Sequence, residues 1–142
     1  MIYNIYKEMI ILEKAKRIVF TVAFGLSIGM IFMWIIIGAC MLVLSENIEF
    51  IEKYAESSTD PMTTEFAKAY FMTLGIIFFV LAVMNVVSAI VAFKGRNSMS
   101  KGVMIGNIVI GALACAEINI VAAIFGLIAI SRNNRKQDVI EE

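Results

Sequence analysis

Long uncharged apolar runs, separated by short charged segments, dominate the pattern along this chain. No charged residue occurs in four stretches: 18–44, 69–93, 102–116 and 118–130. An apolar stretch of about 18 or more residues is typical of a membrane-spanning helix. The pattern therefore predicts an all-α integral membrane protein, in which most side chains face lipid or one another.

The first apolar run, 18–44, predicts a helix that is longer than a bilayer requires. Its 27 residues would extend about 40 Å, compared with roughly 30 Å of hydrocarbon. The run also exceeds the roughly 7–15 apolar residues of a cleavable signal, so we interpret it as an uncleaved span. In the preceding residues 1–17, apolar positions recur at helical spacing among lysines. This spacing favours an amphipathic helix on the membrane surface over a frayed start of the first span.

The connector 45–67 is acidic, and we expect it to form an outer hairpin. Asp60 would cap the second helix, and Pro61 would occupy its first position, where a missing amide proton costs nothing. A partner protein with a basic surface could bind the acidic face, although a merely solvated helix face has the same pattern. Four glutamates recur every three to four residues and would share one face of a helical continuation of the first span: Glu46, Glu49, Glu52 and Glu56.

The number of spans depends on Glu117, the one acid in the apolar region 102–130. As a single helix, this region would place Glu117 near the bilayer centre, at a cost of roughly 2.5–3.5 kcal/mol on insertion scales. As a hairpin that turns at 114–119, it would place the acid at an interface, but each arm would be too short for a full crossing. The energy of the buried acid favours the hairpin.

The distribution of basic residues also favours the hairpin. Lysines and arginines gather in 1–17, in 94–101 and in 132–136, and cytoplasmic flanks are enriched in these residues. Both termini are then cytoplasmic, which requires an even number of crossings. We predict a four-helix transmembrane bundle of two long and two short helices within 18–137, followed by a frayed tail at 138–142.

The layout of the chain carries a resemblance to a known family. From Ser100 to Gln137 there is an apolar arm, a brief turn and a second arm that reads IVAAIFGLIAISR over 120–132. With the long first span, the connector and the second span, this order resembles a family of small bacterial four-span membrane proteins of unknown function. The resemblance implies a Gram-positive-like plasma membrane and no known activity.

Composition limits the chemistry. The chain has 142 residues, of which 61% are hydrophobic, and its 12 basic and 12 acidic residues cancel, so no bulk charge favours nucleic acid. It contains no histidine, the commonest general base and metal ligand, and serines such as Ser27 and Ser88 therefore have no histidine to activate them. We predict a non-enzyme without metal or cofactor. Cys40 and Cys115 are interpreted as small packing residues rather than as a disulfide.

Small and polar residues inside the apolar runs are the candidate site residues. Asn85 and Asn107 are expected to bond across a helix interface, because an unpaired amide in hydrocarbon is costly. Glu117 is assigned to turn capping in preference to ion coupling. Small residues four apart could support helix contacts, either inside the bundle or in a homodimer: Gly25 and Gly29, Gly102 and Gly106, Ala122 and Gly126.

The sequence thus predicts a multi-pass plasma-membrane protein that acts through its outer acidic hairpin, as an interaction, accessory or immunity-type protein. Its expected partners are the lipid bilayer and either another membrane protein or further copies of the chain. The competing hypothesis is a small oligomeric transporter, channel or holin-like pore. That alternative requires Asn85, Asn107 and Glu117 to converge on one shared cavity.

Overall fold

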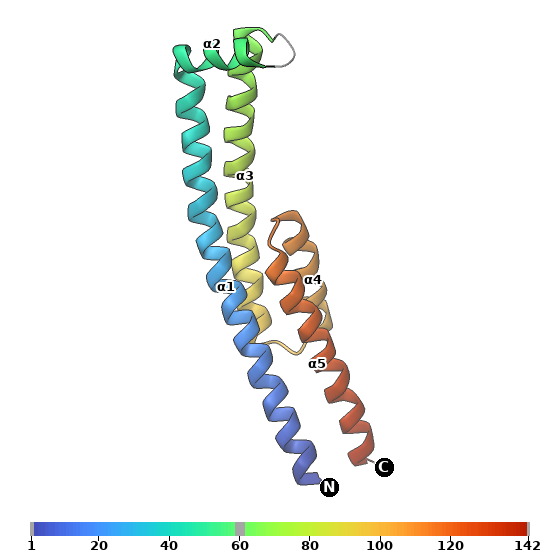
Figure 1. Cartoon of the computed structure of the whole chain (residues 1–142). Helices are drawn as coiled ribbons and strands as arrows, with labels where there is room; N and C mark the ends of the chain where they lie inside the picture. Colours follow the sequence, from blue (N-terminus) through green and yellow to red (C-terminus); the bar gives the residue numbers. More distant parts are fainter. Residues whose placement is uncertain (1, 59–61, 142) are drawn as a thin grey trace. The chain divides into compact units, whose positions relative to one another are not determined.

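All regular secondary structure in the described chain is α-helical, as predicted. The computed structural model describes residues 2–58 and 62–141, and the side chains of residues 6–58 and 62–135. Contacts group the chain into two compact units, one of Met1–Gly29 with Met84–Glu142 and one of Met30–Val83. The helices are α1 (Ile2–Glu46), α2 (Ile48–Ser57), α3 (Thr64–Asn97), α4 (Lys101–Leu113) and α5 (Glu117–Glu141) (Figure 1).

Residues 1–17 do not form a separate surface helix, because α1 runs without a break from Ile2 to Glu46. No glycine or proline occurs before Gly25 to interrupt it. Across the predicted junction, Glu13 and Arg17 form an ion pair of 3.0 Å at the spacing that stabilises a helix. The prediction of an independent N-terminal helix is therefore wrong, and α1 extends about 67 Å over its 45 residues.

In the unit 30–83, the predicted helical continuation of the first span is interrupted at Asn47. This residue leaves the helical region (φ −85°, ψ 96°), and its side chain accepts a hydrogen bond from the amide of Phe50. Such a cap begins a new helix, and α2 runs across the end of α1 towards the start of α3 (Figure 1). The four glutamates therefore do not share one helix, because Glu46 belongs to α1 and the other three to α2.

Helix α2 packs on the first turns of α3 through an apolar cluster. Its buried residues are Ile51, Ala55, Ala67 and Phe71, and the ring of Phe71 meets that of Tyr54 edge-on, with 4.9 Å between centroids. Helix α3 begins at Thr64, where the hydroxyl of the preceding Thr63 accepts from the amide of Phe66 at 3.2 Å. The predicted cap at Asp60 and Pro61 lies outside the described residues.

The same unit contains a close approach of α1 and α3 at two glycines. A Cβ added to Gly38 would lie 3.2 Å from the carbonyl oxygen of Gly75, and one added to Gly75 would lie 2.8 Å from Leu42. Nearby, Trp34 and Phe78 stack with 5.3 Å between their ring centroids. Glycine suits both positions, because an added Cβ would require the facing backbone or the Leu42 side chain to shift.

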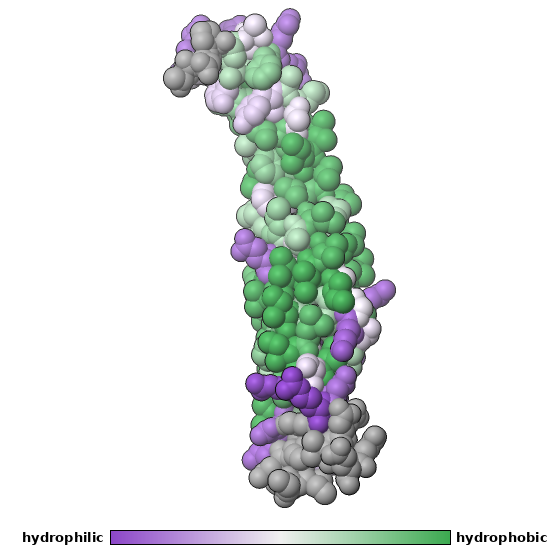
Figure 2. Space-filling view, turned by 90° about the vertical axis from the view of Figure 1, so that its right-hand side faces the viewer, coloured by the Kyte–Doolittle hydropathy of each residue, from purple (hydrophilic) through white to green (hydrophobic). Residues whose placement is uncertain are grey.

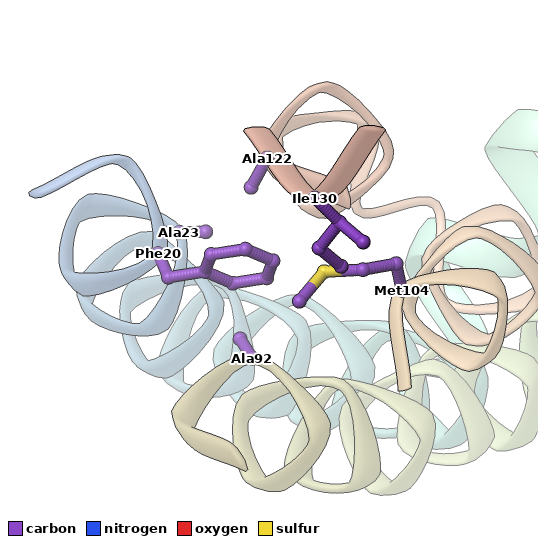
Figure 3. Close-up of a cluster of buried hydrophobic side chains, with 6 residues drawn as sticks. All are labelled: Phe20, Ala23, Ala92, Met104, Ala122 and Ile130. Carbon is purple, nitrogen blue, oxygen red and sulfur yellow. The ribbon is translucent and has the colours of Figure 1, made fainter. Parts of the chain in front are cut away.

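The other unit has its core around the ring of Phe20 on α1. Figure 3 shows this ring among three alanines and the side chain of Met104, with Ile130 beside them. Small neighbours make the space for the ring, since a Cβ on Gly95 would meet Phe20 at 2.5 Å. The cluster takes residues from four helices: Phe20 and Ala23 from α1, Ala92 from α3, Met104 from α4, and Ala122 and Ile130 from α5.

The region 102–130 forms a helix–turn–helix, as the hairpin prediction requires. Helix α4 ends at Leu113 and α5 begins at Glu117. The amide of Ala116 donates to the carbonyl of Gly111 at 2.8 Å, and that of Cys115 donates to the carbonyl of Ala112 at 3.4 Å. This pair of bonds is a Schellman motif, whose left-handed position usually holds glycine. Cys115 occupies it here, with φ 52°.

Among the described residues, two helices are long and apolar enough, by length and composition, to cross a membrane: Tyr6–Glu46 and Thr64–Asn97. Helix α4 is shorter, with 13 residues or about 20 Å. Helix α5 continues to Glu141, so its backbone is helical through most of the predicted frayed tail at 138–142.

Replacing Cys115 with glycine is expected to stabilise the α4–α5 turn. A residue with a Cβ costs about 1 kcal/mol in the left-handed region, and glycine avoids this cost. Thermal unfolding in a mild detergent, followed by circular dichroism, measures the change. The matched control is Ala112→Gly, an exposed position inside α4, which should destabilise the protein by about 0.5–1 kcal/mol. A lower unfolding temperature for Cys115→Gly would contradict the turn described above.

Candidate functional site

A buried polar cluster holds the start of α5 against α1 and α3. Asn119 lies in the first turn of α5, and its side chain is fully buried. Its amide nitrogen donates to the carbonyl oxygen of Ser88 at 3.1 Å and also to the Ser88 hydroxyl. Its amide oxygen accepts from the hydroxyl of Ser27 at 3.4 Å. Because Ser27 is on α1 and Ser88 on α3, one asparagine joins three helices.

Asn85 binds the α4–α5 turn at the end of α4. Its amide nitrogen donates to the carbonyl oxygen of Ala114 at 2.8 Å, one of the last carbonyls of α4, which has no partner within its own helix. Asn85 and Ala114 are both fully buried. The contact crosses from α3 to the α4–α5 turn, as the sequence led us to expect for this asparagine.

Asn107 also bonds across a helix interface, at a different place. Its amide nitrogen donates to the carbonyl of Val91 on α3 at 3.1 Å and to that of Val103 on its own helix at 2.9 Å. Its amide oxygen is buried and has no hydrogen-bond donor among the described residues. Asn85 and Asn107 therefore bind separate backbone carbonyls.

Glu117 is exposed and is the first residue of α5. A negative charge is favourable there, because the amides of the first turn have no helical acceptor and the helix dipole is positive at this end. This position fits the predicted turn-capping role. The amide nitrogens of Asn85 and Asn107 bind the carbonyls of Ala114 and Val91, on different segments of the chain.

The small residues that we selected fall into two groups. Gly126 packs inside the unit, where a Cβ would lie 3.3 Å from the ring of Phe20, and Ala122 is fully buried. Gly25, Gly29 and Gly106 have no neighbouring atom within 4 Å of an added Cβ, and Gly102 meets only the Ser100 hydroxyl, at 3.6 Å. The intramolecular contacts expected at these four glycines are therefore not found in the described chain. The close contacts lie instead at glycines that we had not selected: Gly38, Gly75, Gly95 and Gly111.

The acidic residues of α2 form a solvated face. Glu49, Glu52 and Glu56 are all exposed, while Glu46 on α1 pairs with Lys68 on α3 at 3.2 Å. An exposed pair of this kind contributes little to stability, roughly 0–1 kcal/mol. No cluster of three metal-binding side chains occurs among the residues that the structure describes.

Lys16 is a buried charge that the sequence did not single out. Its side chain is 1% exposed, and its Nζ donates to the carbonyl oxygen of Ser98 and to the sulfur of Met99, which lies 3.2 Å away. Ser98 directly follows the last residue of α3. A lysine is well placed at this end, where helix carbonyls are open and the dipole is negative.

The cysteines are not packing residues. Cys40 and Cys115 are both free, as the choice against a disulfide predicted, but both are exposed and therefore do not pack inside the described chain as we had expected. Their apolar sequence surroundings suggested burial, but Cys115 takes the exposed left-handed position of the turn.

Comparison with known proteins does not assign the chain to a family. No protein-family model, curated protein or solved structure matches it. The likeness to small bacterial four-span membrane proteins therefore stays a prediction, and function is argued below from the geometry.

Replacing Asn119 with alanine is expected to loosen the α4–α5 hairpin. The change removes the donor to Ser88 and the acceptor for Ser27, and buried contacts of this kind contribute about 1 kcal/mol. The unfolding temperature in detergent should fall. The control is Asn134→Ala, an exposed asparagine on the same helix, which should leave that temperature unchanged. Equal shifts for the two variants would count against the role assigned to Asn119.

Proposed function

We propose that the chain is an integral membrane protein whose helices α1 and α3 cross the bilayer. The supporting observation is how little of their apolar surface is covered. In the most apolar 18-residue window of each helix, only 11% of the first window and 28% of the second is buried inside the structure. A core helix of a soluble protein is mostly buried, whereas a lipid-facing helix needs no protein cover. Figure 2 shows hydrophobic residues over much of the visible surface.

Helix α2 has the character of a helix at the membrane surface. Ile51 and Ala55 are buried on one side, and the three glutamates are exposed on the other. Around it, Phe50 and Tyr54 contact Phe71, with 5.4 and 4.9 Å between ring centroids. Aromatic residues gather at membrane–water interfaces, and amphipathic helices lie in that layer. We place α2 at the outer surface.

The orientation follows from the basic residues. The first turns of α1, the segment between α3 and α4 and the end of the apolar part of α5 carry lysines and arginines. The positive-inside rule places these segments in the cytoplasm. Both termini are then cytoplasmic, in the plasma membrane that the family resemblance implies.

The α4–α5 hairpin then enters from the cytoplasmic side and turns before the outer surface, because α4 is only about 20 Å long. Irregular backbone at membrane depth is tolerated where protein buries it. Ala114 and Ala116 of the turn are buried, at 0% and 4% exposure, and Asn85 binds the carbonyl of Ala114. These contacts support a hairpin held within the bilayer by its own chain, which gives the four-helix bundle.

The function that this arrangement supports best is non-enzymatic. Three exposed glutamates, Glu49, Glu52 and Glu56, lie on one short helix at the outer surface, and none of them forms an ion pair with another described residue. Their charges are open to a basic partner. We infer an interaction, accessory or immunity-type protein that binds another membrane protein through α2.

The competing function, a transporter, channel or pore, has less support. It requires polar side chains that converge on a water-filled path. Asn85 and Asn107 instead bind backbone carbonyls, and Glu117 lies exposed at a helix start. The open glycine face of Gly25 and Gly29 is compatible with contact to a second copy, which either function could use.

Accessibility of single cysteines tests the membrane topology. In a Cys40→Ser, Cys115→Ser background, cysteines placed at Ser57, Ser98, Glu117 and Asp138 are labelled from either side with a membrane-impermeant maleimide. We expect Ser57→Cys to react only from outside, and Ser98→Cys and Asp138→Cys only from inside. Glu117→Cys is expected to react weakly from both sides. Labelling of positions 57 and 98 from the same side would overturn the topology, as would a monodisperse protein in buffer without detergent.

Charge reversal tests the acidic face. The triple variant Glu49→Lys, Glu52→Lys, Glu56→Lys is expected to lose the partner that cross-links to the wild-type protein in native membranes, because the attraction becomes repulsion. The control Glu65→Lys changes an exposed acid that lies on α3 beside α2 but is not one of its three glutamates, and should retain the partner. If the triple variant captured the same protein at the same yield, the proposal for α2 would fail.

A further inference from the structure

A cavity of about 180 Å³ lies between the N-terminal part of α1 and the C-terminal part of α5. All of its lining residues belong to one unit, 1–29 with 84–142. The walls come from α1, from the segment between α3 and α4, and from α5. The lining residues are Met9, Leu12, Glu13, Met99, Ala129, Arg132 and Asn133.

The cavity is lined mostly by apolar residues, and its polar lining residues are Glu13, Arg132 and Asn133. Met9, Leu12, Met99 and Ala129 supply aliphatic and thioether surface. Arg132 and Asn133 lie next to each other on α5, directly after the apolar run ends at Ile130. This combination matches a molecule with an apolar chain and a charged head, such as a phospholipid.

The uncompensated charge of the lining is positive. The one acid of the lining, Glu13, is bound to the guanidinium of Arg17 at 3.0 Å, so its charge is largely compensated. Arg132 is exposed, and within the described part of the chain it forms no ion pair. Its guanidinium can therefore bind an anion in the two-pronged geometry that suits phosphate oxygens.

We propose that this cavity binds the headgroup of an anionic phospholipid of the cytoplasmic leaflet. Arg132 binds the phosphate, Asn133 lies beside it to donate a further hydrogen bond, and the first part of an acyl chain lies against Met9 and Leu12. The proposal rests on the membrane topology proposed above, which places the end of the α5 apolar run at the cytoplasmic surface. Basic pockets between membrane helices on this side are suited to such headgroups.

A lipid fits this cavity better than free phosphate. Inorganic phosphate would use only the Arg132 edge and would leave the walls of Met9, Leu12, Met99 and Ala129 without a function. A lipid uses both, since its acyl chain packs against the apolar walls while its phosphate binds Arg132.

Lipid titration of the full chain tests the proposal. The protein is purified in a neutral detergent, and its thermal unfolding and native mass spectrum are recorded with phosphatidylglycerol or phosphatidylcholine of the same acyl chains, or with inorganic phosphate. We expect phosphatidylglycerol to raise the unfolding temperature and to remain bound in the mass spectrum, and the other two to have little effect. Equal effects of the two lipids would overturn recognition of the headgroup. An equal effect of inorganic phosphate would overturn the lipid as occupant.

Two arginines on the same helix provide the matched variants. Arg132→Gln should weaken phosphatidylglycerol binding about tenfold, the loss expected for one charge-assisted contact. Arg135→Gln removes the same charge from an exposed residue outside the cavity lining and should retain affinity within about twofold of wild type, because only diffuse attraction is lost. Equal weakening by both would mean diffuse attraction to the surface and would overturn the site. If Arg132→Gln cannot be purified, Arg132→Lys takes its place and should weaken binding more than Arg135→Lys.

Failure of this inference can be distinguished from failure of the proposed function. A chain that shows the expected cysteine labelling but binds both lipids equally retains its topology and loses only the lipid site. A chain that stays soluble without detergent loses both.

Discussion

The hydrogen bonds of Asn119 are the contacts on which the arrangement of the short helices depends. Asn119 binds Ser88 of α3 and Ser27 of α1 from the first turn of α5. In the bilayer that we propose for this chain, apolar side chains gain little by leaving lipid for one another, so polar contacts and close packing must select one arrangement of helices. A single buried amide that is bonded to two other helices supplies that selection where the hairpin turns.

Close packing supplies the rest, and the two units use it differently. In one unit, small residues such as Ala92 and Gly126 surround the large ring of Phe20. In the other, Gly38 and Gly75 let two helices approach until only backbone and a few side chains separate them. In both cases small residues lie where helices contact closely, as expected for the membrane environment that we propose.

The charges of the chain divide between its segments and suggest what each segment does. Exposed acids on α2 are free to attract a basic protein, and Arg132 near the end of the α5 apolar run is free to attract an anionic lipid. Neither group is needed to hold the described fold together, since exposed charges contribute little to stability. Residues that do not stabilise the fold and are not paired are the ones most available for binding.

The sequence alone determined the helical class, the two long apolar helices and the turn near Glu117, because each follows from local hydropathy and from the cost of burying a charge. It could not determine that Asn47 ends α1, since this asparagine caps a helix only when Ile51 and Ala55 find α3 to pack against. Nor could it identify Cys115 as a left-handed turn residue, a role that usually belongs to glycine. The roles of Ser27, Lys16 and Gly75 depend on atoms 33 to 92 positions away along the chain. Only the tertiary structure brings such groups together, because polar and small residues in apolar helices acquire partners through helix packing and not through their neighbours in sequence.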